Sequence, residues 1–338
     1  MEFGYPMKSE FVAFARGTEF VATAPEGQAG LRWRAKYGFA GLNQQAVPTA
    51  LVDGMNEQGL VVGLLYMPRF AKFESPTKSQ YEKTLSPWEV SNFLLSSSAS
   101  VKEARRAIES VFVAAVATPG FSGFVVPLHY FVADKSGACI VIEYIDGKRI
   151  IYDNPVGVLT NSPSFGWHLS NLSNYVGLSA SNADDLKLGR FTVKGFGQGS
   201  GLLGLPGDYT PPSRFVRAAF FSQLAQKPAK GSDAVNLGFH ILNTFDIFEG
   251  IIHEPAPAKG QEEFADITQW VVAYDQTNRL FYYRGYDGLK IKMIDLRKID
   301  FASAGFKKVG LMETFAPEDI TSQLTPFYPI VYKDNEGP

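Results

Sequence analysis

"LHYFVADKSGACIVIEYIDGKRIIYDNPVGVLTNSP" occupies residues 128–163 and is the stretch that decides the fold. Its runs rich in Val, Ile and Tyr are separated by "DKSG" and "IDGK", two short segments of turn-forming residues. β-branched and aromatic runs joined by such turns are typical of β-hairpins, whose strands lie antiparallel. The stretch therefore predicts a series of antiparallel strands.

The remaining patterns extend this prediction in both directions. Short apolar runs punctuated by Gly, Pro and Asn predict antiparallel strands over residues 1–70 and hairpins over 268–296. A polar, Lys-rich segment at 69–84 predicts a surface loop, and 197–214 is a long connection rich in Gly and Pro. Helical patterns lie at 86–114, 213–226 and 232–248. With no repeat and no linker-like segment, we expect one α+β domain over 1–338, with antiparallel sheets and separate helical layers.

The helical segment at 86–114 carries clear start signals. Ser86 is a good N-cap, Pro87 suits the first turn, and Glu89 completes a capping box. Ser100 precedes "VKEARRAIESV", whose apolar spacing predicts a second, short amphipathic helix.

Composition excludes several classes of protein. The 32 basic and 34 acidic residues nearly cancel and form no block of like charge, which argues against a nucleic-acid partner or a polybasic membrane surface. The longest apolar stretches, such as "GLVVGLLYMP" at 59–68, are too short to cross a bilayer. We therefore expect a globular protein with no membrane and no nucleic-acid partner.

Neither a metal nor a cofactor is indicated. The four histidines show no metal-ligand spacing among themselves or with Cys139, and no nucleotide-binding or nucleophile-elbow motif occurs. Cys139, the sole cysteine, lies in the apolar run "GACIVIEY", so we interpret it as a buried structural residue within a strand.

Three polar residues each allow two interpretations. We expect Asn161 to lie directly after an apolar strand, where it either donates to an oxyanion or caps the following turn or helix. Arg214, at a helix start after "GDYTPPS", is either a carboxylate clamp or part of a structural ion pair. Tyr66, at the end of an apolar strand, faces a site or fills the core.

Six stretches taken in order make the chain similar to the choloylglycine hydrolase family, which comprises bile salt hydrolases and penicillin V acylases. These are "MEFG" (1–4), "DGMNEQGL" (53–60), "HYFVADKSG" (129–137), "YDNPVGVLTNSPSFGWHLSNLSNY" (152–175), "GLPGDYTPPSRFVRA" (204–218) and "TQWVVAYDQTNRLFYYRGYDGLKIKMIDL" (268–296). The resemblance implies a four-layer αββα N-terminal-nucleophile hydrolase with two antiparallel sheets. It implies hydrolysis of linear, non-peptide amide C–N bonds without a cofactor.

The resemblance also assigns roles to residues. Family members attack the amide carbonyl with an N-terminal cysteine whose own α-amine is the base. Asn161 corresponds to the side-chain oxyanion donor, and Tyr66 to the position whose backbone N–H is the second donor. Arg214 corresponds to the active-site arginine, and Glu2 to an acid that contacts the N-terminal amine.

The family's cysteine, however, has no counterpart in this sequence. Its position would lie upstream of Met1, whose thioether has no proton to lose. We therefore expect the 338 residues alone to be inactive and to lack an N-terminal hairpin that carries the nucleophile. The alternative is a non-catalytic binding or scaffold protein that keeps the pocket. The compartment stays open, since a signal peptide in such a segment would direct export and its absence would leave the protein in the cytoplasm.

Substrate choice is expected to lie in three loops, 66–84, 119–127 and 197–212. Their aromatic residues suit an apolar acyl group on a small amide substrate: Phe70, Phe73, Phe121, Phe124 and Tyr209. Homo-oligomers are usual in the family, so the resemblance also implies self-association.

Overall fold

One large antiparallel sheet organises the computed structural model, which describes residues 1–338 except 5, 45–46, 122, 255–263, 304–305, 312–313 and 324–338. The sheet has the strand order β12-β11-β10-β7-β6-β5-β2-β21. The predicted strands of 128–163 form one edge of it, so the hairpin prediction is confirmed. Its strands are β2 (Glu10–Phe14), β5 (Phe39–Gln44), β6 (Val47–Asn56), β7 (Val61–Tyr66), β10 (Leu128–Ala133), β11 (Cys139–Ile145), β12 (Lys148–Asp153) and β21 (Phe306–Gly310).

Side-chain alternation gives this sheet two buried faces. On β2, Val12 and Phe14 pack in a cluster with helices α1 (Val90–Ser97) and α2 (Val101–Glu109). Phe11 and Ala13 point the other way, into a cluster with a second sheet. Because side chains alternate along a strand, both faces can be apolar only where both are covered.

The second sheet lies against the inner face. It consists of β18 (Trp270–Asp275), β19 (Leu280–Gly285) and β20 (Lys292–Asp295), all antiparallel. Trp270 and Phe281 carry its contact with the large sheet. Just before β18, strand β17 (Ile267–Thr268) pairs with β1 (Glu2–Phe3), which places the first residues of the chain beside this sheet.

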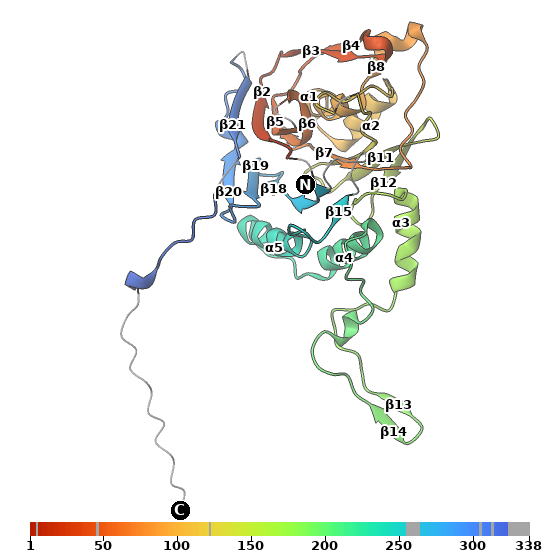
Figure 1. Cartoon of the computed structure of the whole chain (residues 1–338), viewed down its shortest axis with the longest axis vertical. Helices are drawn as coiled ribbons and strands as arrows, with labels where there is room; N and C mark the ends of the chain where they lie inside the picture. Colours follow the sequence, from red (N-terminus) through yellow and green to blue (C-terminus); the bar gives the residue numbers. More distant parts are fainter. Residues whose placement is uncertain are drawn as a thin grey trace, which may run out of the picture.

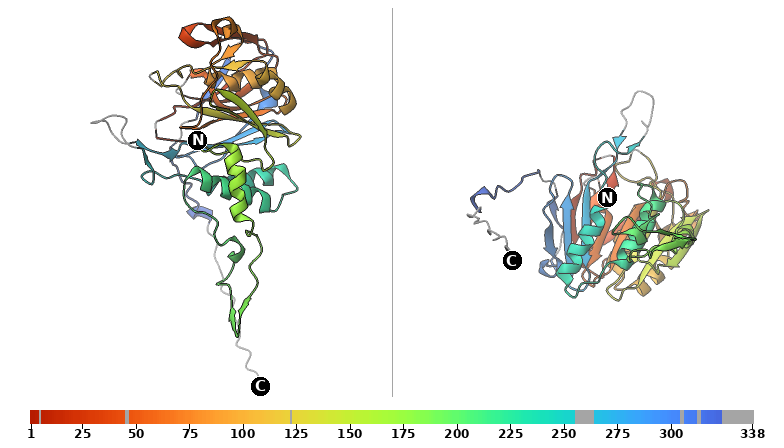
Figure 2. Two further views of the ribbon diagram at one scale, coloured as in Figure 1. Left: turned by 90° about the vertical axis from the view of Figure 1, so that its right-hand side faces the viewer. Right: turned by 90° about the horizontal axis from the view of Figure 1, so that it is seen from below.

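Helices complete the outer layers. α1 and α2 cover the large sheet, while α4 (Pro211–Leu224) and α5 (Gly231–Asn243) lie beyond the second sheet (Figure 1). α3 (Phe165–Asn171) follows β12 and packs with α4 against Val141 of β11. This is the predicted four-layer αββα arrangement, and the left view of Figure 2 shows the layers one above another.

The predicted helix starts are largely confirmed. Ser86 and Glu89 form a reciprocal capping box, and Ser100 accepts a hydrogen bond from the Glu103 N–H. The segment from 232 to 248, predicted as one helix, stops being helical at Asn243, and the Thr268 hydroxyl instead accepts from the Ile247 N–H. A tertiary contact therefore ends this helix.

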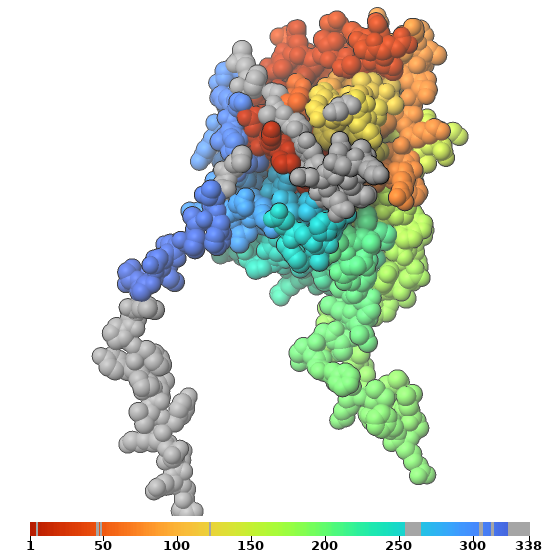
Figure 3. Space-filling model, viewed as in Figure 1, coloured from red at the N-terminus to blue at the C-terminus, as the bar shows by residue number. Residues whose placement is uncertain are grey.

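A long arm leaves the body between α3 and α4. Strands β13 (Leu186–Leu188) and β14 (Phe191–Val193) form its hairpin, which projects from the molecule in the left view of Figure 2 and in Figure 3. The predicted long connection at 197–214 is the return path of this arm. Its exposed apolar side chains include Leu186, Leu188, Phe191, Val193, Phe196 and Leu203.

Three further short strand pairs complete the description. β3 (Glu19–Thr23) and β4 (Ala29–Arg34) form a hairpin, and β8 (Thr84–Leu85) runs parallel to β9 (Phe112–Val113). β15 (His253–Glu254) pairs with β16 (Phe264–Ala265). Among the described helices, none is both long and apolar enough to cross a membrane.

Candidate active site

Asn161 lies in the loop that joins β12 to α3. We expected an apolar strand directly before it, which is wrong: β12 ends at Asp153, and the intervening residues form a loop because Asn154 bonds to the backbone of 156–158. The Asn161 Nδ2 donates to the Tyr66 carbonyl at 2.7 Å. Its Oδ1 accepts from Arg214 Nη2 at 2.6 Å. Both ends of the amide are therefore held, and Asn161 does not cap a helix.

Arg214 is held at the start of α4 by the loop before it. Thr210 is the N-cap and prolines occupy the first turn, where a missing N–H costs nothing. Hydrogen bonds from Ser213 and Thr210 lower the pKa of Asp208 to about 2 and fold the loop onto the helix. Arg214 Nε donates to the Tyr209 carbonyl at 2.9 Å, so the guanidinium plane is fixed from two sides.

Glu2 lies on the other side of Arg214. One Glu2 oxygen is 4.0 Å from Arg214 Nη1, and the other is 3.9 Å from the Met1 amine. Burial raises the pKa of Glu2, but the amine and Arg214 outweigh this and hold the pKa below 4.5. Burial also lowers the pKa of Arg214, and Glu2 opposes that shift. Glu2 is therefore an ionised carboxylate between two positive groups.

The first residue is anchored beside this carboxylate. The Met1 amine donates to the Trp270 carbonyl at 2.7 Å, and the Met1 carbonyl accepts from the Gln269 N–H at 2.9 Å. Gln269 also donates from its side chain to the Phe3 carbonyl. Asp53 is a second, buried carboxyl whose pKa burial raises to about 6, against the lowering effects of the Tyr274 hydroxyl and the amine.

The four residues that the sequence predicted thus meet in one place. A chain of contacts runs from the amine through Glu2, Arg214 and Asn161 to Tyr66. Tyr66 is not a core aromatic residue, because 37% of it is exposed. The ion pair expected for Arg214 exists, and its partner is Glu2.

No thiol belongs to this cluster. Cys139 is the first residue of β11 and is only partly buried, so its predicted mid-strand burial is wrong. Burial still raises its pKa to about 12, despite a hydrogen bond with Asn154, so the thiol stays protonated near neutral pH. In the described part of the chain, no hydrogen bond joins Cys139 to Asn161 or Arg214.

Sequence reasoning missed the groups behind Asn161. His129 on β10 and His168 on α3 are fully buried and contact the Thr160 and Asn161 carbonyls. Glu143 on β11 pairs with His129 at 3.2 Å. The available signal was a histidine and a glutamate inside otherwise apolar strands, because such groups are buried only with partners.

The aromatic residues of the predicted substrate loops include both buried and exposed rings. Phe73 is buried in the cluster beneath the large sheet, so its predicted place in a substrate loop is wrong. Phe70 and Phe124 are exposed, and the rings of Phe121 and Phe3 meet edge-on at 6.1 Å. Exposed rings are thus available on two of the three predicted loops.

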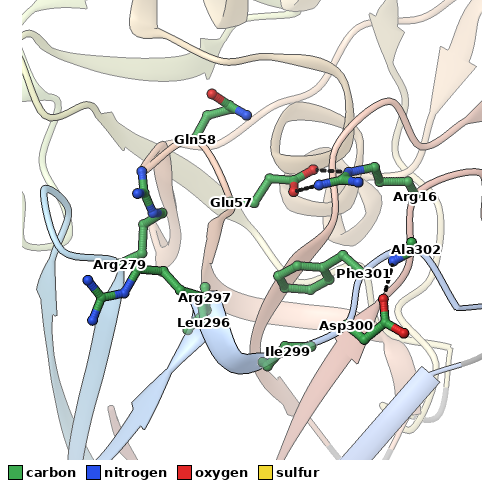
Figure 4. Close-up of a pocket in the computed structure, with 10 residues that line it drawn as sticks. All are labelled: Arg16, Glu57, Gln58, Arg279, Leu296, Arg297, Ile299, Asp300, Phe301 and Ala302. Carbon is green, nitrogen blue, oxygen red and sulfur yellow. Dashed lines mark hydrogen bonds and ion pairs between the residues drawn. The ribbon is translucent and has the colours of Figure 1, made fainter.

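A hollow of about 440 Å³ lies elsewhere, at the end of β6 (Figure 4). Arg16 and Glu57 form a two-bond ion pair along one wall, and the Asp300 side chain accepts from the Ala302 N–H. Arg297, on another wall, bonds to Asp295 through two nitrogens. None of the residues that line this hollow belongs to the Asn161 cluster.

The described residues contain no group of three or more His, Cys, Asp or Glu able to hold a metal ion. What the Asn161 cluster offers instead is an oriented amide, a guanidinium, a carboxylate and an amine. These are groups that stabilise developing negative charge and position a base.

Comparison with known proteins gives consistent matches. A family model described as "Linear amide C-N hydrolases, choloylglycine hydrolase family" matches residues 1–309. The bile salt hydrolase/transferase of Clostridium perfringens is 36% identical over 273 residues, covering 78% of each chain. The penicillin V acylase of Pectobacterium atrosepticum is 27% identical over 303 residues, covering 82% of this chain and 71% of that one. A crystal structure of a variant of the C. perfringens conjugated bile acid hydrolase superposes with a TM-score of 0.83 at 28% identity, covering 95% of this chain and 94% of that one.

Proposed function

Because this chain belongs to the choloylglycine hydrolase family of linear amide C–N hydrolases, we propose that its Asn161 cluster is the active site of such a hydrolase. The observation that carries the proposal is the held amide of Asn161. Asn161 Nδ2 donates one hydrogen to the Tyr66 carbonyl, and Arg214 donates to Asn161 Oδ1. The second Nδ2 hydrogen is therefore left to donate to an oxyanion.

The proposed reaction needs a thiol at the amine end of this cluster. The thiol adds to the amide carbonyl while the α-amine takes its proton, and Asn161 with the Tyr66 backbone N–H holds the oxyanion. Collapse gives a thioester and releases the amine product, which receives the proton. Water then cleaves the thioester to the free acid and the thiol. Glu2 holds the amine by charge, and Arg214 orients the Asn161 amide.

The nucleophile is proposed to be an N-terminal cysteine on a hairpin that precedes Met1. The support is positional: the Met1 backbone nitrogen, from which such a hairpin would extend, lies 3.9 Å from Glu2, and neither a thioether nor the protonated Cys139 can serve. The 338 residues alone are then inactive, and together with that hairpin they form a single domain.

The substrate is proposed to be a small amide with an apolar acyl group. Relatives are named for hydrolysis of conjugated bile acids and for acylase action on penicillin V. The exposed rings of Phe70 and Phe124 offer apolar contact for a steroid or an aryl acyl group.

The decisive experiment compares two forms of the protein. One is the 338-residue chain, and the other carries the N-terminal cysteine segment of the C. perfringens relative, with a serine version as the matched control. Each is assayed on penicillin V, glycine- and taurine-conjugated bile salts and an acyl-homoserine lactone. Hydrolysis by the cysteine form alone supports the proposal. Equal hydrolysis by both forms refutes the mechanism, and binding without hydrolysis by the cysteine form supports the scaffold alternative.

Self-association is proposed to use the projecting arm, with a second copy of this chain as its partner. Its apolar residues are exposed on both strands of a two-stranded hairpin, which is marginally stable without further packing. Light scattering should give a multiple of 37.2 kDa for the unaltered chain. Replacing Leu188 and Phe191 with serine should reduce that mass, and a monomeric unaltered chain contradicts the proposal.

A further inference from the structure

We infer that His129 and His168 are positioning residues that fix the backbone on either side of the Asn161 amide. The inference rests on the proposed function of Asn161 and deepens it. The two imidazoles come from different layers: His129 from the large sheet and His168 from α3, which lies beside β12 (Figure 1). Each contacts one of two successive carbonyls, those of Thr160 and Asn161.

His129 holds the first of these carbonyls. Its Nε2 lies 3.1 Å from the Thr160 oxygen, and because a carbonyl only accepts, Nε2 carries the hydrogen. Its Nδ1 lies 3.2 Å from Glu143 Oε1, which also accepts from the Phe165 N–H at 2.9 Å. One carboxylate thus ties the imidazole to the start of α3, so both ends of the segment 160–165 are attached to β11.

His168 holds the second carbonyl. Its Nε2 lies 2.9 Å from the Asn161 oxygen and therefore also carries the hydrogen. Its Nδ1 is buried without a partner among the described residues, which matches a neutral ring. The ring stacks on Phe215 with centroids 4.6 Å apart and planes at 14°, and Phe215 directly follows Arg214. His168 therefore couples the Asn161 backbone to the helix that carries the arginine.

The consequence is that Asn161 is fixed in both backbone and side chain. Arg214 and Tyr66 set the plane of the amide, and the two histidines set where its Cα lies. An oxyanion donor works only at hydrogen-bond distance from the developing charge, and a displacement of about 1 Å can cost about 100-fold in rate. Loss of either imidazole contact should therefore act on kcat through Asn161.

The test uses matched substitutions at His129. His129→Leu removes both contacts, whereas His129→Gln keeps a donor at the Nε2 position. Tyr130→Phe is the control, because the neighbouring Tyr130 is equally buried on β10 and donates to the Pro87 carbonyl at 2.9 Å, in a loop that does not contact Asn161. Tyr130→Phe removes one buried hydrogen bond from a side chain to a carbonyl, at a comparable cost in unfolding free energy.

The first readout needs no catalysis and uses the 338-residue chain. With ¹⁵N-labelled asparagine, the Asn161 side-chain amide signals are assigned by their loss in Asn161→Asp. His129→Leu and His168→Phe should shift or broaden these signals, His129→Gln should restore them, and Tyr130→Phe should leave them unchanged. Unchanged signals in folded His129→Leu overturn the inference.

The second readout uses the cysteine-bearing form. Per folded protein, His129→Leu should lower kcat about 10- to 100-fold with little change in KM, and His129→Gln should recover most of it. An equal fall in Tyr130→Phe overturns the inference, since it would mean general loosening. If the unaltered cysteine form hydrolyses none of the substrates, the proposed function fails, and the amide signals still decide the positioning role.

Discussion

The Asn161 cluster and the hollow at the end of β6 both contain arginine and carboxylate, yet they use them differently. In the hollow, Arg16 and Arg297 each bond to a carboxylate through two nitrogens, and their side chains are 53% and 48% exposed. In the cluster, Arg214 is 16% exposed and lies 4.0 Å from Glu2. Its hydrogen bonds go to Tyr209 and Asn161 instead.

The difference shows what separates a site from a surface ion pair. A two-bond pair places the two opposite charges in direct contact, so little net charge is left for a ligand. In the cluster, the hydrogen bonds of Arg214 go to neutral groups and its charged partner Glu2 lies 4.0 Å away, so one Asn161 amide hydrogen stays available for a ligand. The hollow therefore has volume but closely paired charges, whereas the Asn161 cluster has an amide hydrogen available for a ligand.

The largest expected effect concerns stability. Glu143→Ala leaves His129 buried without its partner and should cost about 3–5 kcal/mol of unfolding free energy. Glu57→Ala in the hollow leaves Arg16 in water and should cost only about 1 kcal/mol. Urea unfolding at pH 7.5 measures both. Similar losses at the two positions would remove the distinction between the regions.

A smaller effect is expected on the rate. In the unaltered chain, two nitrogens of Arg214 reach the Tyr209 carbonyl and Asn161 Oδ1, whereas Arg214→Lys has only one nitrogen to offer. Because the Asn161 amide is then less firmly oriented, kcat of the cysteine-bearing form should fall about 10- to 100-fold. Arg297→Lys is the matched change in the hollow and should leave kcat within about twofold. A fall of similar size in Arg297→Lys would extend the active site to the hollow.

The smallest effect is a difference in pH dependence. Burial lowers the pKa of His168 below 6.5, so as the pH falls the imidazole is protonated in the unfolded chain before it is protonated in the folded chain. The stability that the neutral His168 contributes is therefore fully present above pH 6.5 and is lost as the pH falls below that value. Burial raises the pKa of Glu57, but hydrogen bonds from Arg16 and Gly38 bring it below 4.5, so its contribution is lost only as the pH falls below that value.

Unfolding curves at pH 7.5, 5.5 and 4 separate the two regions. His168→Phe should lose less stability than the unaltered chain between pH 7.5 and 5.5, and Glu57→Gln should differ in slope only towards pH 4. Comparing each variant with the unaltered chain is necessary, because the raised pKa values of Asp53 and Glu89, about 6 and about 7, contribute with the opposite sign. Parallel curves for His168→Phe and the unaltered chain would contradict the buried, neutral ring.

Local patterns predicted the elements, and the family resemblance predicted the site. The turns of 128–163 and the capping box of Ser86 depend on neighbouring residues, so the sequence reveals them. Only the family resemblance predicts a site role for Asn161 and Arg214, because their contact joins residues 53 positions apart and no local pattern reveals it. The role of His129 depends on a carbonyl 31 residues along the chain, and that of His168 on a loop carbonyl seven residues before it, and no local pattern marks either partner.

The most direct test of the central claim is the rate after removal of the Asn161 amide. In the cysteine-bearing form, Asn161→Ala should lower kcat about 100- to 1,000-fold, the usual cost of one oxyanion donor. Asn174→Ala, which removes an exposed amide that bonds only to Asn171 in the described residues, should leave kcat unchanged. A kcat for Asn161→Ala within a few-fold of the unaltered form would contradict the account.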